Sequence, residues 1–250
     1  MSVRWSWSGA SGKGGRERNE DSWVGARLGD GAAAIVADGL GGHSDGQLAS
    51  RVAVRAAQRF LRGCGEGGDP ETIAAGCVRA AADAVRAEQR RRKSDLSSTI
   101  AVAVAAGDLI GWAHCGDTRI YLLARDAASL RLTGDHSVAM AALPEGERLT
   151  ADVRHDPRRN VLVSSLGGED PMIDTGGGSI GADEALALCS DGFWEHAAEE
   201  DLFDLAAAGY DAPRLAVALA RRKPFNGDNF TLATLFRATR RRGIWGWRMR

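Results

Sequence analysis

Acidic residues stand beside apolar segments of this chain and limit the folds that it can adopt. They are Glu20 and Asp21 in RERNED, Asp38 in VADGLGGH, Asp191 in LALCSDGFW and Asp228 in GDNFT. Four of them lie at the ends of apolar runs that are typical of strands. A buried carboxylate without a positive partner either shifts its pKa or destabilises the fold. If these acids converge on one place, they indicate a metal site.

The type of ligand indicates the type of ion. The five acids offer carboxylate oxygens, and hardly any His or Cys accompanies them. Hard divalent cations prefer oxygen ligands, so Mg²⁺ or Mn²⁺ is expected rather than Zn²⁺ or Cu²⁺. Such ions point toward phosphate chemistry.

The composition is that of an ordinary soluble globular chain with one domain or two small ones. Of its 250 residues, 44% are apolar and 26% are charged, which allows a sizeable core. The net charge of -1 provides no general attraction to nucleic acid or to an anionic membrane. No segment approaches the ~20 apolar residues that span a bilayer, and the N-terminus lacks the apolar core of a signal peptide. We therefore expect a cytoplasmic protein with no nucleic-acid partner and no transmembrane segment.

Hydrophobic periodicity predicts strands and then two helices in the first part of the chain. Residues 3–7 alternate in polarity, and WVGARL and AAAIVA follow as further strand-like runs, which suggests an antiparallel opening. From residue 44 to about 61, apolar residues recur at four-residue steps, as in an amphipathic helix. A second helix is predicted over about 70–91, with Pro70 in its first turn and basic residues at its end.

The rest of the chain is richer in strands. STIAVAVAAG, DLIGWAHCG, TRIYLLA and SLRLT are separated by turn residues and predict a meandering antiparallel sheet. Residues 135–183 are the least regular part and are expected to form a flap. A strand in EALALCS, two short helices near 199–207 and 212–222, and a strand in NFTLATLF complete the pattern.

The order of these elements favours a layered α+β sandwich. A strand block, a helix pair, a second strand block, a second helix pair and a final strand do not suit a doubly wound parallel sheet. The sequence contains no internal repeat and no linker. Its last eleven residues, RRRGIWGWRMR, contain five arginines and two tryptophans. Such a segment suits contact with a partner, an anionic membrane surface or the domain itself.

Two phosphate-binding loops can be excluded. SGKGG lacks the first glycine of a Walker A loop, because Trp7 stands there, and its lysine is followed by Gly14 rather than Ser or Thr. A dinucleotide fingerprint would need a glycine where Ser44 stands, and Asp38 would repel a pyrophosphate. The same aspartate becomes favourable when a divalent ion lies between it and the phosphate.

An ordered set of motifs runs from residue 16 to residue 231. The motifs are RxxNED, DGLGGH, SSTIAVAV, CGDTRIYLL, LTGDHS, RNVLVSSLG, LCSDGFW and DNFT. Together they resemble the metal-dependent Ser/Thr protein phosphatases of the protein phosphatase 2C (PPM) family in their bacterial form. The resemblance implies a four-layer αββα sandwich, in which two antiparallel β-sheets are flanked by helix pairs. It also implies one catalytic domain over 1–240, with its flap at about 135–183, and a basic, Trp-containing tail over 241–250.

The resemblance implies a binuclear site for Mn²⁺ or Mg²⁺. By analogy, Asp38 bridges the two ions, and the Gly39 carbonyl coordinates one of them together with Glu20 or Asp21. A hydroxide bridging the metals, rather than a side chain, would then attack the phosphorus atom.

The remaining metal ligands are assigned by the same analogy. Asp191 and Asp228 would hold the second ion. Asp117 in CGDTR matches the position that, with Asp191, holds a third and weaker ion in bacterial relatives.

Two further residues are assigned to catalysis. Arg16 matches the family's phosphate-binding arginine, whose planar fork takes two phosphate oxygens; alone, it would be read as a surface ion pair. Eukaryotic relatives have a proposed general acid, a histidine, directly after the DG pair, where this chain has Leu40. His43 follows later and is a candidate to protonate the leaving alkoxide, or to cap or orient the next helix.

The leading functional prediction is hydrolysis of phosphoserine and phosphothreonine in proteins, in opposition to Ser/Thr kinases. The expected partners are phosphorylated proteins, either kinase targets or a kinase itself, and the chain is expected to act as a monomer. Two alternatives remain. One is a non-catalytic phosphoprotein-binding scaffold on the same fold, and the other is a phosphatase for small phosphoesters.

Overall fold

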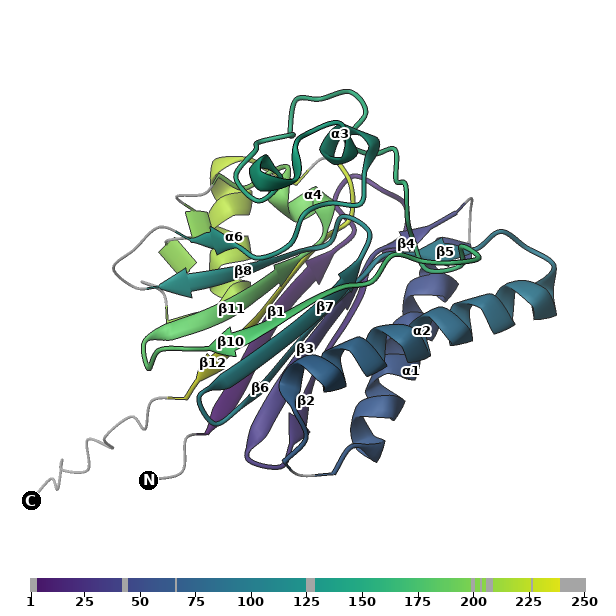
Figure 1. Cartoon of the computed structure of the whole chain (residues 1–250). Helices are drawn as coiled ribbons and strands as arrows, with labels where there is room; N and C mark the ends of the chain where they lie inside the picture. The colour runs from purple at the N-terminus through teal and green to yellow at the C-terminus, as the bar shows by residue number, and fades with distance from the viewer. Residues whose placement is uncertain are drawn as a thin grey trace, which may run out of the picture.

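The computed structural model describes residues 4–41, 45–65, 67–124, 129–198, 201–202, 204–205, 209–225 and 227–238. Within these ranges, two five-stranded antiparallel sheets pack face to face, and helices cover their outer faces (Figure 1). This arrangement confirms the predicted α+β sandwich with its helix, sheet, sheet and helix layers. His43 and the tail over 241–250 lie outside the described residues.

The first sheet joins the two ends of the described chain. Its strands lie in the order β1 (Trp5–Gly12), β12 (Phe230–Arg237), β11 (Glu184–Cys189), β8 (Arg119–Ala124) and β9 (Leu130–Arg131). β1 runs antiparallel to β12 over its whole length, from the pair Trp5 and Arg237 to the pair Gly12 and Phe230. The first strand therefore pairs with the last one and not with its neighbour in sequence.

The second sheet is formed mainly by the first half of the chain. Its strands lie in the order β10 (Asp174–Ser179), β7 (Leu109–Cys115), β6 (Ile100–Ala106), β3 (Gly31–Ala37) and β2 (Ser22–Leu28). A separate short ladder pairs β4 (Gly39–Leu40) with β5 (Ser97–Ser98).

β3 is buried along its whole length because both of its faces are covered. Alternate side chains of a strand point to opposite faces. Ala33 and Ile35 belong to the core under the helices, whereas Ala32, Ala34 and Val36 belong to the core between the sheets. Such small and β-branched residues allow the layers to approach closely.

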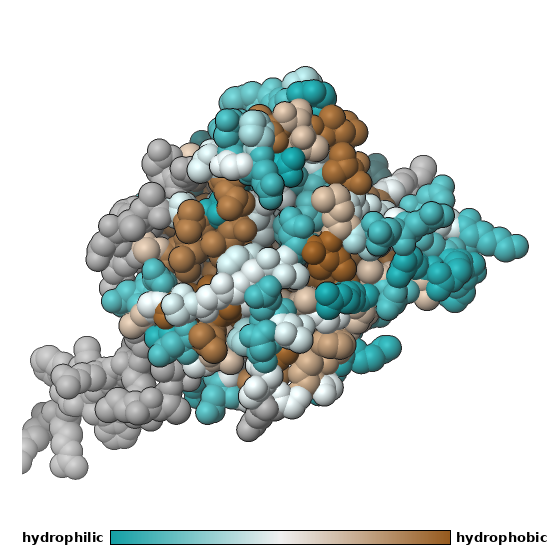
Figure 2. Space-filling model, viewed as in Figure 1, coloured by the Kyte–Doolittle hydropathy of each residue, from teal (hydrophilic) through white to brown (hydrophobic). Residues whose placement is uncertain are grey.

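Two long helices, α1 (Asp45–Gly63) and α2 (Pro70–Arg92), cover the second sheet. α2 begins where the Asp69 carboxylate accepts a hydrogen bond from the Thr72 N–H at 2.9 Å, and Pro70 occupies its first turn. It ends at Lys93, which has a left-handed φ of 55°. Figure 2 shows hydrophilic residues over the outer end of α2, which agrees with its basic last turn. Both helices match their predicted ranges within two residues.

The helical layer on the first sheet is shorter. It contains α4 (Asp191–Trp194) and α6 (Ala212–Arg222), and residues 201–202 and 204–205 are also helical. Within the described ranges, none of the helices combines the length and the apolar character needed to cross a membrane.

One prediction about the strands is wrong. The four β-type runs after residue 97 do not form a single meander, because β6 and β7 belong to the second sheet whereas β8 and β9 belong to the first. The chain changes sheets at residues 116–118, where Gly116 has a φ of 102°. A turn signal shows that a strand ends, but it does not show which sheet receives the next strand.

The flap predicted over 135–183 ends earlier than expected. Its described part contains α3 (Val138–Ala141) and the 3₁₀ helix η1 (Glu145–Glu147), but β10 is an edge strand of the second sheet. Its sequence, DTGGGS, has low strand propensity. Gly176 is nevertheless required there, because an added Cβ would lie 2.3 Å from the Trp112 ring.

Candidate active site

The predicted acidic residues meet at one end of the sandwich because neighbouring strands run antiparallel. Asp21 precedes β2 and Asp38 follows β3, so the pairing of these strands brings both acids to the same end. Asp191 follows β11 and Asp228 precedes β12, which are also antiparallel neighbours. Asp117 lies where the chain passes from β7 to β8.

Asp38 lies in the middle of the group. Its N–H donates to Thr99 Oγ1 at 3.0 Å, and its carbonyl accepts hydrogen bonds from Ser98 Oγ and the Thr99 N–H, both at 2.8 Å. These bonds fix the backbone and do not involve the carboxylate, which interacts with the carboxyl groups of Asp21 and Asp191. Burial raises the pKa of Asp38 well above its ordinary value, and the charges of Asp21, Asp191 and Asp117 raise it further.

Asp21 is buried beneath Asp38. Its Oδ2 accepts hydrogen bonds from the hydroxyls of Ser190 and Thr231, both at 2.7 Å. Its Oδ1 is buried and has no hydrogen-bond partner among the described residues. Burial raises the pKa of Asp21 to about 6, even though the two hydroxyls act in the opposite direction.

Asp117 and Asp191 complete the buried part of the group. The Asp117 carbonyl accepts a hydrogen bond from Trp194 Nε1 at 3.0 Å, and Asp191 Oδ1 accepts one from the Gly192 N–H at 2.6 Å. The pKa of Asp117 is raised by burial and then by the charge of Asp191. Burial, followed by the charge of Asp228, raises the pKa of Asp191 to about 7.

Glu20 and the Gly39 carbonyl lie side by side at the start of α1. A Cβ added to Gly46 would lie 2.8 Å from both Glu20 Oε2 and the Gly39 carbonyl oxygen. A Cβ on Gly39 would lie only 1.9 Å from the Gly46 carbonyl oxygen. Both glycines therefore keep two oxygen donors accessible. Burial raises the pKa of Glu20.

Arg16 and Asp228 form the exposed rim of the site. Arg16 Nη2 lies 2.6 Å from Asp228 Oδ2, and the two side chains are 60% and 38% exposed. The predicted phosphate-binding guanidinium is therefore adjacent to one of the predicted metal ligands, and solvent can reach both.

The charge balance of the site suits divalent cations. In the described part of the chain, Asp21, Asp38, Asp117 and Asp191 form no ion pair with Lys or Arg. Their raised pKa values come from burial and mutual repulsion, which a cation at this place would relieve. Together with the unpartnered Oδ1 of Asp21, the donor set fits hard ions that prefer oxygen ligands.

Known proteins contain the same sequence pattern. Residues 8–215 match the family described as Protein phosphatase 2C. The chain belongs to the protein phosphatase 2C family. Serine/threonine protein phosphatase PstP of Mycobacterium tuberculosis is 32% identical over 193 residues, which are 76% of this chain and 36% of PstP. The chain thus matches only about a third of that relative's length.

One further relative and one solved catalytic domain are matched over most of their length. Serine/threonine phosphatase stp of Listeria innocua is 29% identical over 217 residues, which are 84% of this chain and 86% of stp. The crystal structure of the catalytic domain of PstP, in complex with two manganese ions, has a TM-score of 0.77 and 28% identity. That match covers 95% of this chain and 100% of the PstP chain.

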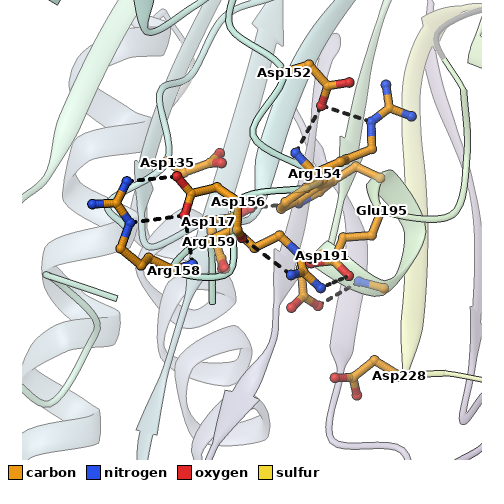
Figure 3. A network of polar contacts seen from close by, with 12 residues as sticks. Asp117, Asp135, Asp152, Arg154, Asp156, Arg158, Arg159, Asp191, Glu195 and Asp228 are labelled. Carbon is orange, nitrogen blue, oxygen red and sulfur yellow. Dashed lines mark hydrogen bonds and ion pairs between the residues drawn. The ribbon is translucent and has the colours of Figure 1, made fainter. Parts of the chain in front are cut away.

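The segment predicted to form a flap in this protein phosphatase 2C chain is held beside the end of α4 by two arginines. Arg159 Nε and Nη2 lie 2.5 and 3.1 Å from the two carboxylate oxygens of Glu195. Arg154 Nη1 donates to the Ala197 carbonyl at 2.8 Å. Figure 3 shows that Arg159 and Glu195 face each other beside Asp191. The flap therefore borders the acidic group directly.

Asn229 supports the acidic site but is not among the residues predicted for it from the sequence. Its amide nitrogen donates to the carbonyls of Lys13 and Arg18, and its amide oxygen accepts the Glu20 N–H. It thereby fixes the loop that carries Arg16 and Glu20. The motif DNFT contains this residue, but the sequence does not show that its side chain bridges to residues more than two hundred positions away.

A second group of possible metal ligands, His114, His136 and Asp174, offers atoms within 4.8 Å of one another. Nδ1 of His136 accepts the Gly116 N–H, so the neutral ring carries its proton on Nε2, which faces Asp174 at 3.3 Å. A cation there would need the lone pair of that nitrogen, so the hydrogen bonding does not suit a metal. Burial lowers the pKa of His114 to about 4. These contacts indicate structural roles for both histidines.

Proposed function

We propose that the chain hydrolyses phosphoserine and phosphothreonine in proteins, with two Mn²⁺ or Mg²⁺ ions as cofactors. One observation carries the proposal, namely the convergence of Asp21, Asp38, Asp117 and Asp191, which form no ion pair with Lys or Arg among the described residues. Membership of the protein phosphatase 2C family and the two manganese ions in the PstP structure support it.

We assign the metal ligands as follows. Asp38 would be shared by both ions, because its carboxylate is the one within the influence of Asp21, Asp117 and Asp191. Glu20 and the Gly39 carbonyl would hold one ion, since they lie together over Gly46. When bound, the ions would supply positive charge for the transferring phosphoryl group and lower the pKa of a coordinated water.

The other ion would be held by Asp191 and Asp228, and Asp117 with Asp191 would provide a third, weaker position. Asp21 Oδ2 is used by two hydroxyls, so only its unpartnered Oδ1 would be available to an ion. We favour Glu20 beside the Gly39 carbonyl because both oxygens lie over Gly46, and Asp21 stays the alternative ligand.

Arg16 would bind the phosphate of the substrate. Its guanidinium stands at the rim beside Asp228 and is exposed enough to change partner. A planar fork can donate to two phosphate oxygens at once, which a lysine cannot do. The role of His43, as a general acid or as a cap of α1, stays a prediction, because this residue lies outside the described ranges.

The two alternative functions remain distinguishable. A scaffold that only binds phosphoproteins has no need of a complete set of metal ligands, whereas all of the expected acids stand in this chain. A phosphatase for small phosphoesters would need the same acids, because a two-metal centre recognises little beyond the phosphate. The protein substrate and an opposing kinase therefore rest on the family.

The decisive experiment measures phosphate release from a phosphothreonine peptide with and without Mn²⁺, for the wild type and for Asp38→Asn. We expect turnover that requires Mn²⁺ and is abolished by the substitution, while circular dichroism shows that the variant is folded. A folded wild type without turnover at millimolar Mn²⁺ would favour the scaffold. Faster turnover of a small phosphoester than of several phosphopeptides would favour the other alternative.

A further inference from the structure

A cleft of about 360 Å³ opens beside Asp228, next to the site proposed for the reaction. Its walls include Glu195 and His196 after α4, Lys223 and Phe225 after α6, and Asp228 itself. Asp228 contacts Arg16 at 2.6 Å, so one end of the cleft adjoins the proposed phosphate position. A substrate residue next to the phosphorylated one would reach this cleft, because consecutive Cα atoms are only about 3.8 Å apart.

The wall made by Phe225 is apolar and firmly held. The Phe225 ring stacks on Phe230 with 3.9 Å between the ring centroids and on His196 with 4.0 Å. His196 Nε2 is hydrogen-bonded to the Lys223 carbonyl oxygen at 2.8 Å. Burial lowers the pKa of His196, so the imidazole is neutral near pH 7. The histidine therefore adds shape and no charge to the cleft.

The negative charges of the cleft are already compensated. Both carboxylate oxygens of Glu195 are bound by Arg159. Asp228 is paired with Arg16, and in the proposed function an ion would balance its charge when Arg16 turns to the phosphate. Neither acid is therefore available to repel an anionic substrate strongly.

Lys223 is the uncompensated charge of the cleft. It is exposed and forms no ion pair in the described part of the chain. Its charge acts on the His196 ring, which lines the same cleft. The neighbouring Arg222 differs, because its guanidinium is bound to Asp201 at 2.8 Å. An ammonium of this kind attracts carboxylates and phosphates.

We propose that this cleft selects phosphoprotein segments with an anionic residue next to the phosphorylated one, and that Lys223 contacts that anionic group. The inference rests on the proposed phosphatase function and adds a substrate class to it. A carboxylate of Asp or Glu and a second phosphate share the required chemistry. The apolar wall at Phe225 accommodates the aliphatic part of the same side chain.

The test compares kcat/KM for three phosphothreonine peptides that differ in the residues flanking the phosphothreonine, which are alanine, aspartate or a second phosphothreonine. An exposed ion pair is worth about 0.2–1 kcal/mol, so the wild type should prefer the aspartate peptide over the alanine peptide by about 1.4- to fivefold. Lys223→Gln should remove this preference, and Lys223→Glu should invert it. The third peptide shows whether a second phosphate is preferred over a carboxylate.

Arg221→Glu is the matched control. It changes the net charge by the same amount as Lys223→Glu. Arg221 is exposed on α6, two residues before Lys223, but it does not line the cleft. It should leave the preference unchanged. Equal kcat/KM for the alanine and aspartate peptides in the wild type, or equal effects of the two Glu substitutions, would overturn the inference. Absence of Mn²⁺-dependent turnover with every peptide would instead overturn the proposed function.

Discussion

Two buried acidic regions lie close together in this protein and differ in how their charge is balanced. Asp135 is bound by Arg119 through two hydrogen bonds of 2.9 and 2.7 Å, and both side chains are almost completely buried. The guanidinium also lies 3.5 Å from the Trp194 ring centroid. The carboxylates of Asp38 and Asp117 have no such partner among the described residues.

The difference separates a structural acid from a functional one. The chain balances the charge of Asp135 with its own cation, so this pair is complete when the protein folds. The carboxylates around Asp38 repel one another, and protons or bound cations would relieve that repulsion. Trp194 connects the two regions, because its ring lies under Arg119 and its Nε1 holds the Asp117 carbonyl.

The largest expected effect comes from neutralising one of the uncompensated acids. Asp191→Asn keeps the acceptor for the Gly192 N–H but loses a charge that we assign to metal binding. Loss of several kcal/mol of electrostatic stabilisation should lower kcat/KM by about 10³-fold. Above pH 7, the metal-free variant should be more stable than the metal-free wild type, because a repulsive charge is gone. A variant that is both active and less stable would contradict the comparison.

Breaking the Arg119–Asp135 pair should lower the stability of the metal-free protein, whereas Asp191→Asn should raise it. Arg119→Met leaves Asp135 buried without a partner and should lower the free energy of unfolding by about 3–5 kcal/mol. Urea denaturation of the metal-free protein measures this loss. The double variant Arg119→Met with Asp135→Leu should recover most of the stability, because no buried charge remains. If the single variant lost less than about 1 kcal/mol, Asp135 would not depend on Arg119 as we infer.

Asn229→Ala tests whether the uncharged Asn229 amide holds the loop that carries Arg16 and Glu20 in place. The substitution removes the two hydrogen bonds to the Lys13 and Arg18 carbonyls and the one from the Glu20 N–H. We expect a loss of about 1–3 kcal/mol in stability. The Mn²⁺ concentration for half-maximal activity should rise about tenfold, as for residues that orient metal ligands. Unchanged Mn²⁺ dependence would show that this loop does not position Glu20 for an ion.

The smallest predicted effect concerns pH. The pKa of Asp21 in the folded protein is about 6 and that of Asp191 about 7, both above the ordinary value of 3.8. The folded state therefore keeps protons that the unfolded state releases, and these groups reduce the stability of the metal-free protein as pH rises from about 4 to 7.

The melting temperature in EDTA measures this effect at pH 5 and at pH 7.5. Other groups also titrate, so the readout is the melting temperature of Asp191→Asn minus that of the wild type. This difference should increase by a few degrees from pH 5 to pH 7.5. Mn²⁺ should raise the melting temperature of the wild type most at the higher pH. A difference that shrinks with rising pH would contradict the assigned repulsion.

Local patterns predicted the parts of the fold that depend on neighbouring residues. The four-residue spacing in α1, and the proline and the basic residues at the ends of α2, predicted the bounds of these helices within two residues. Capping and amphipathicity act over one or two turns and are therefore visible in the local sequence. The runs that became β3, β6, β7, β8 and β11 were recognisable from their apolar character. β10 was not, because its glycines have low strand propensity, and Gly176 is required by the Trp112 ring on the adjacent strand.

The sequence by itself determined which acids this protein carries and the order in which strands and helices follow one another. Only the tertiary structure decided that β1 pairs with β12 and that the chain changes sheets between β7 and β8. It also decided that Arg119 pairs with Asp135, whereas Asp117, two residues earlier in sequence than Arg119, forms no ion pair with any described residue. Strand pairing and charge balance depend on contacts between segments far apart in the chain. Local propensity carries no information about those contacts. For that reason the sequence does not show which aspartates are paired with an arginine in the folded protein.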